Sequence, residues 1–384
     1  MADWPFPPPI VPMEAEVADE LPPPPGWAYE PKWDGFRVVI WSVGLDGGIG
    51  GAGDGGRDPR LDSRNAKPLL RYFPELAPAL AHLPSGTVVD GEVIVVIDGR
   101  LDFDALQNRI HPAESRVRLL AHDTPALLAL FDLLALRGDD LRPTQFSGRR
   151  LALERLAAEL GAESGPERPA GPDRDPGSTQ ESPWVLSPST TDVEVARRWF
   201  HEFEPAGFDG IVAKALDRPY AEGRREMIKV KHRRTVDCVV GGYRLRKDGG
   251  RIGSLLLGLY NRGGELHFIG HCSSFSDAES AVLLEALRPL QPGPGDPVTA
   301  GFGEHARHPG APSRWSSDKD PDFVAVRPIL VVEVSYDQLT GDRFRHATRF
   351  ERWRPDKDPR DCTLDQLERP RGPALIEALR QAQA

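Results

Sequence analysis

The sequence predicts an α+β protein with two domains, the second of which is a small β-barrel. Its 384 residues suffice for two or three domains, and an apolar content of 39% suffices for buried cores. Strand-like and helix-like stretches alternate up to residue 232, whereas the remainder consists of short strands interrupted by one helix. We therefore expect a first domain at residues 1–232 and a second at residues 233–384.

Runs of β-branched and large apolar residues predict the strands of the first domain. They occupy residues 36–41, 87–96, 126–134, 211–214 and 227–231. Apolar residues recur at a helical spacing over residues 148–160 and predict a helix there. A second helix is expected over residues 192–203, where Asp192 stands at the N-cap position.

The second domain is expected to be an OB-type barrel. Its strand-like stretches are residues 236–243, 254–260, 265–271, 329–336 and 345–353, and its one helix covers residues 277–290. Five strands and one helix in a chain of this length are typical of the OB fold.

Three segments rich in Gly, Pro and charged residues separate the predicted elements: residues 46–59, 161–183 and 291–312. We interpret the first as an enlarged hairpin loop and the other two as loose surface loops. None of them contains the GxxxxGK[ST] pattern of a phosphate-binding loop.

The composition excludes several classes of protein. No apolar run reaches the roughly 18 residues that a membrane helix needs, and the acidic, Pro-rich N-terminus is not a secretory signal. The three cysteines, Cys238, Cys272 and Cys362, are scattered and support neither a disulfide framework nor a zinc site. We expect a cytoplasmic protein with no membrane partner.

The charges are unevenly distributed. The formal net charge of -10 argues against a simple polybasic nucleic-acid binder. Nevertheless, residues 214–251 contain 12 Lys and Arg against 5 Asp and Glu, and residues 343–360 contain 7 against 3. Two interpretations fit each stretch: it binds a polyanion, or it forms a solvated surface of the protein. Lysine is rare, with 8 against 40 arginines, so each lysine is a candidate for chemistry that arginine cannot perform.

One such lysine lies in the motif EPKWDGFR at residues 30–37. The Asp-Gly pair favours a tight turn, which would fix Lys32 at a strand edge with its amine in a cleft. A deprotonated lysine is a nucleophile, and burial or nearby positive charge promotes deprotonation. The same residues also suit a surface lysine before a hairpin turn.

A second pair of lysines lies in the predicted strand IKVK at residues 228–231. Alternate strand residues share a face, so Lys229 and Lys231 point in the same direction. Two adjacent ammonium groups suit a phosphate between them, or an edge strand whose charges oppose aggregation. Two acidic turns, DGEV at residues 90–93 and DGIVAK at residues 209–214, complete the set.

The order of these motifs resembles that of the covalent nucleotidyltransferases, which include ATP-dependent DNA ligases, RNA ligases and mRNA capping enzymes. The full series is KWDGFR, SRN, DGEV, FDLL, DGIVAK and IKVK, followed by the RxDK ending at residues 354–357. The amino-acid sequence in and around these motifs looks most like that of the short bacterial ATP-dependent DNA ligases of the ligase C type. The resemblance covers nearly the whole chain apart from the three loop segments. The resemblance implies an ATP-grasp-like ligase domain of antiparallel sheets and helices, followed by an OB-fold barrel.

The resemblance also implies a mechanism and residue roles. Lys32 would attack the α-phosphate of ATP, and the AMP would pass to the 5′-phosphate of a nick in duplex DNA, which the 3′-hydroxyl then seals. Lys229 and Lys231 would contact the α-phosphate and depress the pKa of Lys32. Phe131 would stack on adenine, Glu30 would help to select it, and Lys214 would take part in ATP binding. Arg37 and Arg64 would hold the ribose or the nick phosphate, and Glu92 the ribose or a metal. Asp209 would hold Mg²⁺ or Mn²⁺, and Arg354, Asp356 and Lys357 would orient the pyrophosphate.

Two positions depart from the family pattern. Asp209 stands where the superfamily usually has Glu, and Ala66 stands where Gly is common. The alternatives to a DNA-repair ligase are an RNA ligase, a capping guanylyltransferase and an inactive OB-type nucleic-acid binder. A monomer, an association with the nucleoid and a partnership with a repair polymerase are expectations at the level of the family.

Overall fold

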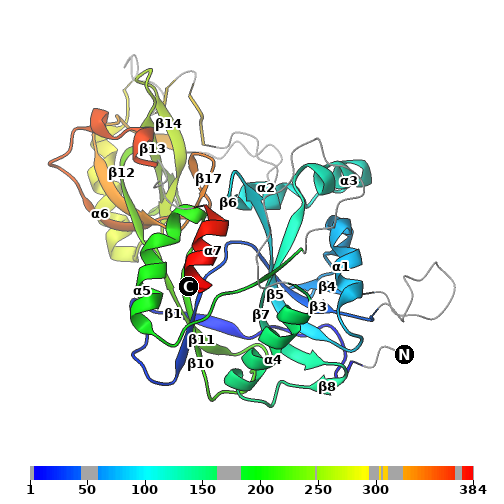
Figure 1. Ribbon diagram of the computed structural model, residues 1–384. Helices are drawn as coiled ribbons and strands as arrows, with labels where there is room; N and C mark the ends of the chain where they lie inside the picture. The colour runs from blue at the N-terminus through cyan, green and yellow to red at the C-terminus, as the bar shows by residue number, and fades with distance from the viewer. Residues whose placement is uncertain are drawn as a thin grey trace. The chain divides into compact units, whose positions relative to one another are not determined.

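The computed structural model describes residues 4–44, 59–161, 183–246, 249–293, 302–303, 306–309, 323–367 and 374–383. The expected loops at residues 46–59, 161–183 and 291–312 lie largely outside the described residues. The chain divides into two compact units, one of residues 1–231 with 370–384 and one of residues 232–369 (Figure 1). The α+β class predicted from the sequence is confirmed.

The first unit contains two mainly antiparallel sheets. One sheet has the strand order β1 (Glu14–Val17), β11 (Arg225–Lys231), β10 (Gly210–Ala215) and β2 (Trp27–Pro31). The other has the order β4 (Arg60–Ser63), β3 (Phe36–Trp41), β5 (Val88–Ile97), β7 (Ala126–Leu136) and β8 (Asp139–Asp140). The short strands β6 (Arg100–Leu101) and β9 (Trp184–Leu186) pair with β5 and β7.

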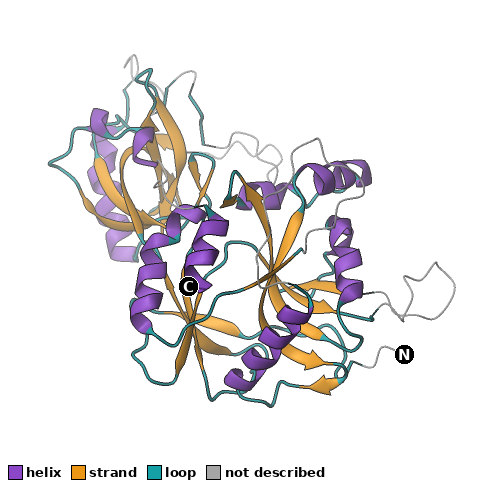
Figure 2. Ribbon diagram, viewed as in Figure 1, coloured by secondary structure: helices purple, strands orange, loops and turns teal. Residues whose placement is uncertain are grey.

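Helices surround these sheets (Figure 2). They are α1 (Ala77–His82), α2 (Phe103–Asn108), α3 (Glu114–Asp123), α4 (Phe146–Glu159), α5 (Val193–Glu202) and α7 (Leu375–Gln383). The carboxylate of Asp192 accepts a hydrogen bond from the Glu194 N–H, so the predicted N-cap is present. No described helix is long and apolar enough to cross a membrane.

The C-terminal helix α7 corrects the predicted extent of the second domain. Leu375, Ala378 and Leu379 of α7 are buried in the same apolar cluster as Ala196 and Trp199 of α5. The two helices accordingly lie side by side in Figure 1. Because the apolar face of α7 is covered by the first unit, the chain returns to that unit after the barrel instead of ending in it.

The second unit is a barrel of five main strands. Their order is β14 (Leu266–Ser273), β13 (Ile252–Tyr260), β12 (Arg234–Leu245), β16 (Val331–Tyr336) and β19 (Arg349–Trp353). The Thr348 N–H donates to the His271 carbonyl at 2.9 Å, which joins the segment before β19 to β14 and closes the ring. Smaller elements are β15 (Val324–Ala325), the β17–β18 hairpin (Leu339–Thr340 and Arg343–Phe344) and α6 (Asp277–Leu287).

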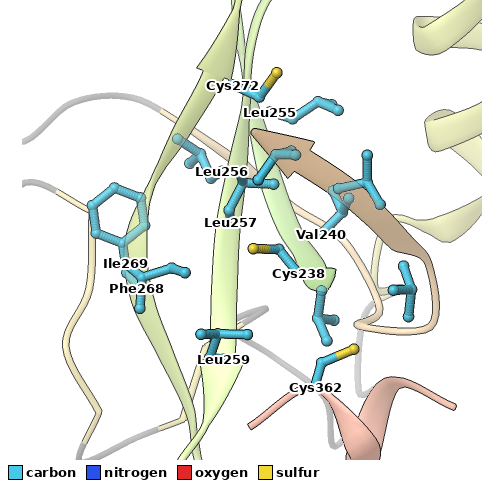
Figure 3. Close-up of a cluster of buried hydrophobic side chains, with 14 of the residues drawn as sticks. Cys238, Val240, Leu255, Leu256, Leu257, Leu259, Phe268, Ile269, Cys272 and Cys362 are labelled. Atoms are coloured by element: carbon cyan, nitrogen blue, oxygen red, sulfur yellow. The ribbon is translucent and has the colours of Figure 1, made fainter. Parts of the chain in front are cut away.

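The three cysteines lie in the apolar core of this barrel. Figure 3 shows Cys238, Cys272 and Cys362 among leucine, isoleucine and phenylalanine side chains. Burial raises the pKa of the Cys272 thiol to about 11 and that of the Cys362 thiol to about 12. All three are free thiols that serve as small apolar side chains.

Candidate active site

Lys32 lies where the chain passes from one sheet of the first unit to the other. It follows β2, the edge strand of the four-stranded sheet, and β3 of the other sheet begins four residues later. The Lys32 N–H donates to the Gly210 carbonyl at 2.8 Å, and the Asp209 N–H donates to the Lys32 carbonyl at 2.9 Å. These bonds extend the β2–β10 ladder and place the side chains of Lys32 and Asp209 beside each other.

Two glycines allow this close approach of strands. A Cβ atom at Gly35 would lie 2.3 Å from the Val93 carbonyl oxygen, and one at Gly210 would lie 2.0 Å from the Val230 carbonyl oxygen. Gly210 also has a φ of +135°, which side-chain-bearing residues rarely adopt. The glycines of the KWDG and DGIVAK motifs therefore allow the strands of the site to approach each other closely.

The Lys32 amine is paired with a buried carboxylate. Its Nζ lies 2.8 Å from Asp209 Oδ2, and Lys231 Nζ lies 3.4 Å from the same oxygen. The side chain of Asp209 is 3% exposed, whereas that of Lys32 keeps 22% exposure. The structure thus brings together the predicted nucleophile, one predicted phosphate contact and one predicted metal ligand.

The expected depression of the Lys32 pKa is wrong. Burial lowers the pKa of Lys32, but the carboxylates of Asp209, Glu92 and Asp34 together outweigh burial and raise it. Burial raises the pKa of Asp209, but the charges of Lys32 and Lys231 outweigh burial and lower it. Lys32 and Asp209 are therefore both charged near neutral pH.

The pKa values of Lys229 and Glu92 shift in the directions opposite to those of Lys32 and Asp209. Burial and the charges of Lys231 and Lys32 lower the pKa of Lys229. Burial raises the pKa of Glu92 to about 7, against the opposing effect of Lys32 and Arg37. The predicted cluster is therefore electrostatically coupled, with a surplus of positive charge at Lys229, which suits an incoming phosphate.

Arg37 is held by a buried network that sequence reasoning missed. Its guanidinium donates to both oxygens of Asp90, at 2.9 and 2.6 Å, and the Tyr220 hydroxyl donates to Asp90 Oδ2 at 2.6 Å. The Arg37 guanidinium carbon also lies 5.1 Å from the centre of the Phe131 ring. Asp90 belongs to the DGEV motif, but nothing in the sequence pairs it with Tyr220, which is 130 residues away.

Glu30 and Lys214 form a second buried pair. Lys214 Nζ lies 2.8 Å from Glu30 Oε2, donates to the Phe131 carbonyl at 2.8 Å, and lies 4.7 Å from the centre of the Phe131 ring. Lys214, predicted to bind ATP, therefore contacts both Glu30 and Phe131, the two residues predicted at adenine. Arg150 of α4, which the motifs did not indicate, lies 3.6 Å from the other oxygen of Glu30.

Arg64 differs from the other predicted residues because its side chain is 61% exposed and lies 4.0 Å from Glu14. Its charge nevertheless contributes to lowering the pKa of Lys229, so it belongs to the same electrostatic environment.

The described residues contain no group of three or more His, Cys, Asp or Glu side chains arranged to hold a metal ion. The carboxylates of Asp209 and Glu92 are of the ligand type that Mg²⁺ binds, one or two at a time, together with substrate phosphates.

Arg354, Asp356 and Lys357 lie in the second unit, where Arg354 and Lys357 share Asp237 as a partner. Arg354 Nη1 donates to both oxygens of Asp237, at 2.9 and 3.0 Å, and Lys357 Nζ lies 3.2 Å from Asp237 Oδ2. Arg354 also pairs with Asp356 at 2.9 Å. Asp237 is a residue that sequence reasoning missed, because no motif of the RxDK ending includes it.

Comparison with known families agrees with this geometry. The family model described as "ATP dependent DNA ligase domain" matches residues 12–231, and the model described as "ATP dependent DNA ligase C terminal region" matches residues 248–357. The first match lies in the first unit, and the second lies in the barrel.

Two curated relatives extend the similarity over nearly the whole chain. DNA ligase C2 of Mycolicibacterium smegmatis is 44% identical over 376 residues, which cover 96% of this chain and 97% of that protein. DNA ligase C of Mycobacterium tuberculosis is 46% identical over 369 residues, which cover 94% and 95%. A solved structure described as "Pmar-Lig_PreS3" is similar with a TM-score of 0.52 at 17% identity, covers 85% of this chain and 63% of that one, and supports the fold alone. The chain belongs to the ATP-dependent DNA ligase family.

Proposed function

We propose that this protein uses ATP to seal nicks between a 5′-phosphate and a 3′-hydroxyl in duplex DNA. The observation that carries the proposal is the position of the Lys32 amine, 2.8 Å from Asp209 and within the electrostatic reach of Lys231, Lys229 and Glu92. A lysine among lysines and carboxylates suits attack on a phosphate. The first unit acts as the adenylation domain, and the barrel acts as the OB-fold domain.

In the first step, the Lys32 amine loses its proton and attacks the α-phosphorus of ATP. A nitrogen–phosphorus bond forms, and the bond to pyrophosphate breaks. Lys229 and Lys231 contact the α-phosphate and draw the polyphosphate toward Lys32. Such transfers depend on positioning and on neutralising the charge of the transferred group.

In the second step, an oxygen of the nick 5′-phosphate attacks the AMP phosphorus and the bond to Lys32 breaks, which gives a DNA-adenylate. In the third step, the 3′-hydroxyl attacks the 5′-phosphate and AMP leaves. Arg37 and Arg64 hold the ribose or the nick phosphate, while Arg354, Asp356 and Lys357 orient the pyrophosphate. Asp209 and Glu92 would hold Mg²⁺ or Mn²⁺, which would neutralise phosphate charge.

The curated relatives support DNA over the alternatives of RNA ligation and cap formation, because those reported above are named as DNA ligases. A further relative, which is 30% identical over 322 residues, is named as a multifunctional non-homologous end joining DNA repair protein of Mycobacterium tuberculosis. This name supports a role in repair, in which a repair polymerase would be the partner. We propose a monomer that works in the cytoplasm at the nucleoid.

The test is a nick-sealing assay combined with transfer of label from α-labelled ATP to the protein, using Lys32→Arg. Arginine keeps the charge but cannot serve as the nucleophile. We expect neither sealed DNA nor labelled protein. Lys67→Arg is the matched control, because Lys67 is an exposed lysine outside the cluster and should keep both activities. A labelled Lys32→Arg protein would overturn the proposal.

A further inference from the structure

One carboxylate of the barrel holds both cations of the RxDK ending. Arg354 Nη1 lies 2.9 and 3.0 Å from the two oxygens of Asp237, and Lys357 Nζ lies 3.2 Å from its Oδ2. The side chain of Asp237 is 11% exposed, and those of Arg354 and Lys357 are 19% and 29% exposed. Free arginine and lysine side chains adopt many rotamers, and a contact that fixes them removes this freedom before a ligand arrives. Asp237 therefore orders two side chains that would otherwise be mobile.

The position of Asp237 is set by the barrel itself. On one side of β12, Asp237 lies opposite Glu333 of β16. On the other side, its N–H donates to Gln366 Oε1 at 3.2 Å and its carbonyl accepts from Gln366 Nε2 at 3.1 Å, so this amide takes the place of a neighbouring strand. The Arg354 N–H donates to the Val331 carbonyl at 2.9 Å, which attaches the start of the RxDK ending to the same sheet. The carboxylate and the arginine are therefore both carried by backbone that hydrogen bonds hold in place.

The other edge of the Arg354 guanidinium faces an exposed carboxylate. Its Nε and Nη2 donate to Asp356 at 3.0 and 2.9 Å, and the side chain of Asp356 is 65% exposed. An ion pair with an exposed group contributes little, so a phosphate can compete for this edge, where it takes two parallel hydrogen bonds. The Lys357 ammonium has three donors, so its contact with Asp237 leaves donors for pyrophosphate. Asp237 can thus keep its hold on both cations while they bind this ligand.

We propose that Asp237 is a positioning residue for the transfer of AMP to Lys32. It holds Arg354 and Lys357 side by side in the arrangement in which they bind the pyrophosphate group of ATP and stabilise its departure. The proposal rests on the function proposed above and on the role given there to these two cations. Pyrophosphate leaves only in the first step, so Asp237 should affect that step and not the sealing of DNA that already carries AMP.

The test compares the wild-type protein with Asp237→Asn, which keeps the shape of the side chain and removes its charge. The rates to be measured are labelling of the protein by α-labelled ATP, release of the label as ATP when inorganic pyrophosphate is added to the labelled protein, and sealing of a nicked duplex that already carries AMP on its 5′-phosphate. Asp342→Asn is the matched control, because Asp342 also binds an arginine of the barrel, Arg307, through both oxygens at 2.8 and 2.9 Å.

We expect Asp237→Asn to lower kcat/KM for labelling by ATP about tenfold or more, since charge-assisted contacts that order both cations are lost. The pyrophosphate concentration that gives half the maximal release should rise by a similar factor, whereas sealing of the adenylated nick should stay within about twofold of the wild type. Asp237→Glu, which restores a carboxylate, should recover part of the loss. Asp237→Asn should cause no further loss in a protein that already carries Arg354→Ala and Lys357→Ala, and Asp342→Asn should match the wild type throughout.

The ratio of labelling to sealing decides the assignment, because a variant that is partly unfolded loses both activities together. An unchanged ratio in Asp237→Asn would overturn the proposal, since it shows that Asp237 serves only the fold of the barrel. Faster labelling would overturn it as well, since Asp237 would then withhold the two cations from ATP instead of presenting them. Failure of the proposed function is distinct, because the wild-type protein would then form no adduct with ATP.

Discussion

Lys32 is held as a cation by the carboxylate that lies closest to it. Asp209 is 2.8 Å away and raises the pKa of Lys32, although burial alone would lower it. Although Asp is one methylene shorter than Glu, the carboxylate of Asp209 contacts the Lys32 amine directly. Under the proposed mechanism, polyphosphate drawn in by Lys229 and Lys231 must compete with Asp209 before Lys32 can act as a nucleophile.

The buried carboxyl of Glu92 lowers the stability of the folded protein when it ionises. The pKa of Glu92 is raised from an ordinary value of 4.5 to about 7, mainly by burial. Below about pH 4.5 the carboxyl is protonated in the folded and unfolded states alike and costs nothing. As the pH rises to 7, the unfolded state ionises more readily than the folded state, so the folded state loses relative stability.

Glu92→Gln removes this cost. We expect the variant to be more stable than the wild type at pH 8 by about 2 kcal/mol, with partial solvent exposure of the side chain taken into account, and the difference to vanish toward pH 4.5. Urea unfolding in EDTA across this pH range measures it. A difference that is constant with pH, or that grows as the pH falls, would contradict the assigned pKa.

Two turns of the site put opposite demands on their residues. Ala66 adopts a φ of +58° in the turn after the SRN motif, where its N–H donates to the Ser63 carbonyl at 2.8 Å. This left-handed conformation explains why Gly suits the position. Gly35, in contrast, is required by the 2.3 Å approach of its hypothetical Cβ to the Val93 carbonyl.

Exchanging the residue type at these two positions should therefore have opposite effects. Ala66→Gly relieves backbone strain but adds freedom to the unfolded chain, so we expect a change in unfolding free energy of less than about 1 kcal/mol. Gly35→Ala forces β3 and β5 apart and should cost about 3 kcal/mol or more. Thermal unfolding of the two variants checks both values, and a strongly destabilised Ala66→Gly would disprove the strain argument.

The elements that sequence analysis predicted are those with a strong local pattern. The strands β3, β5, β7, β10 and β11 and the five barrel strands lie close to the predicted ranges, because runs of β-branched and apolar residues mark buried strands. In contrast, β2 contains the site residue Glu30 and ends in Pro31, directly before Lys32, and it was not predicted. Its pairing with β10, which is about 180 residues further along the chain, depends on tertiary contacts that no local pattern encodes.

The site was predicted to the extent that its residues lie in motifs. Lys32, Asp209 and Lys231 meet as the motifs imply. Arg150 could not be found in this way, since a helical arginine usually faces solvent, and Tyr220 lies in none of the motifs.

At the scale of the whole molecule, the covalent order of the chain differs from the order of its compact units. The barrel is formed by residues 232–369, yet the helix that follows it, α7, is part of the first unit. The barrel is therefore connected to the first unit at both of its ends. The apolar residues of α7 contribute to the same cluster as Tyr29 and Trp33, which flank Glu30 and Lys32 in sequence.

A substitution in α7 should therefore lower the stability of the first unit and not that of the barrel, which precedes α7 in the chain. Leu379 is buried in the cluster with α5, so Leu379→Ala should lower the stability of the first unit by about 2–4 kcal/mol. Leu256→Ala, at a fully buried position of the barrel, is the counterpart and should act on the second unit. Hydrogen exchange of peptides from the two units distinguishes these effects. Faster exchange in β10 and β11 of Leu379→Ala, with unchanged exchange in β12 and β13, is expected, and faster exchange confined to the barrel strands would show that α7 belongs to the second domain after all.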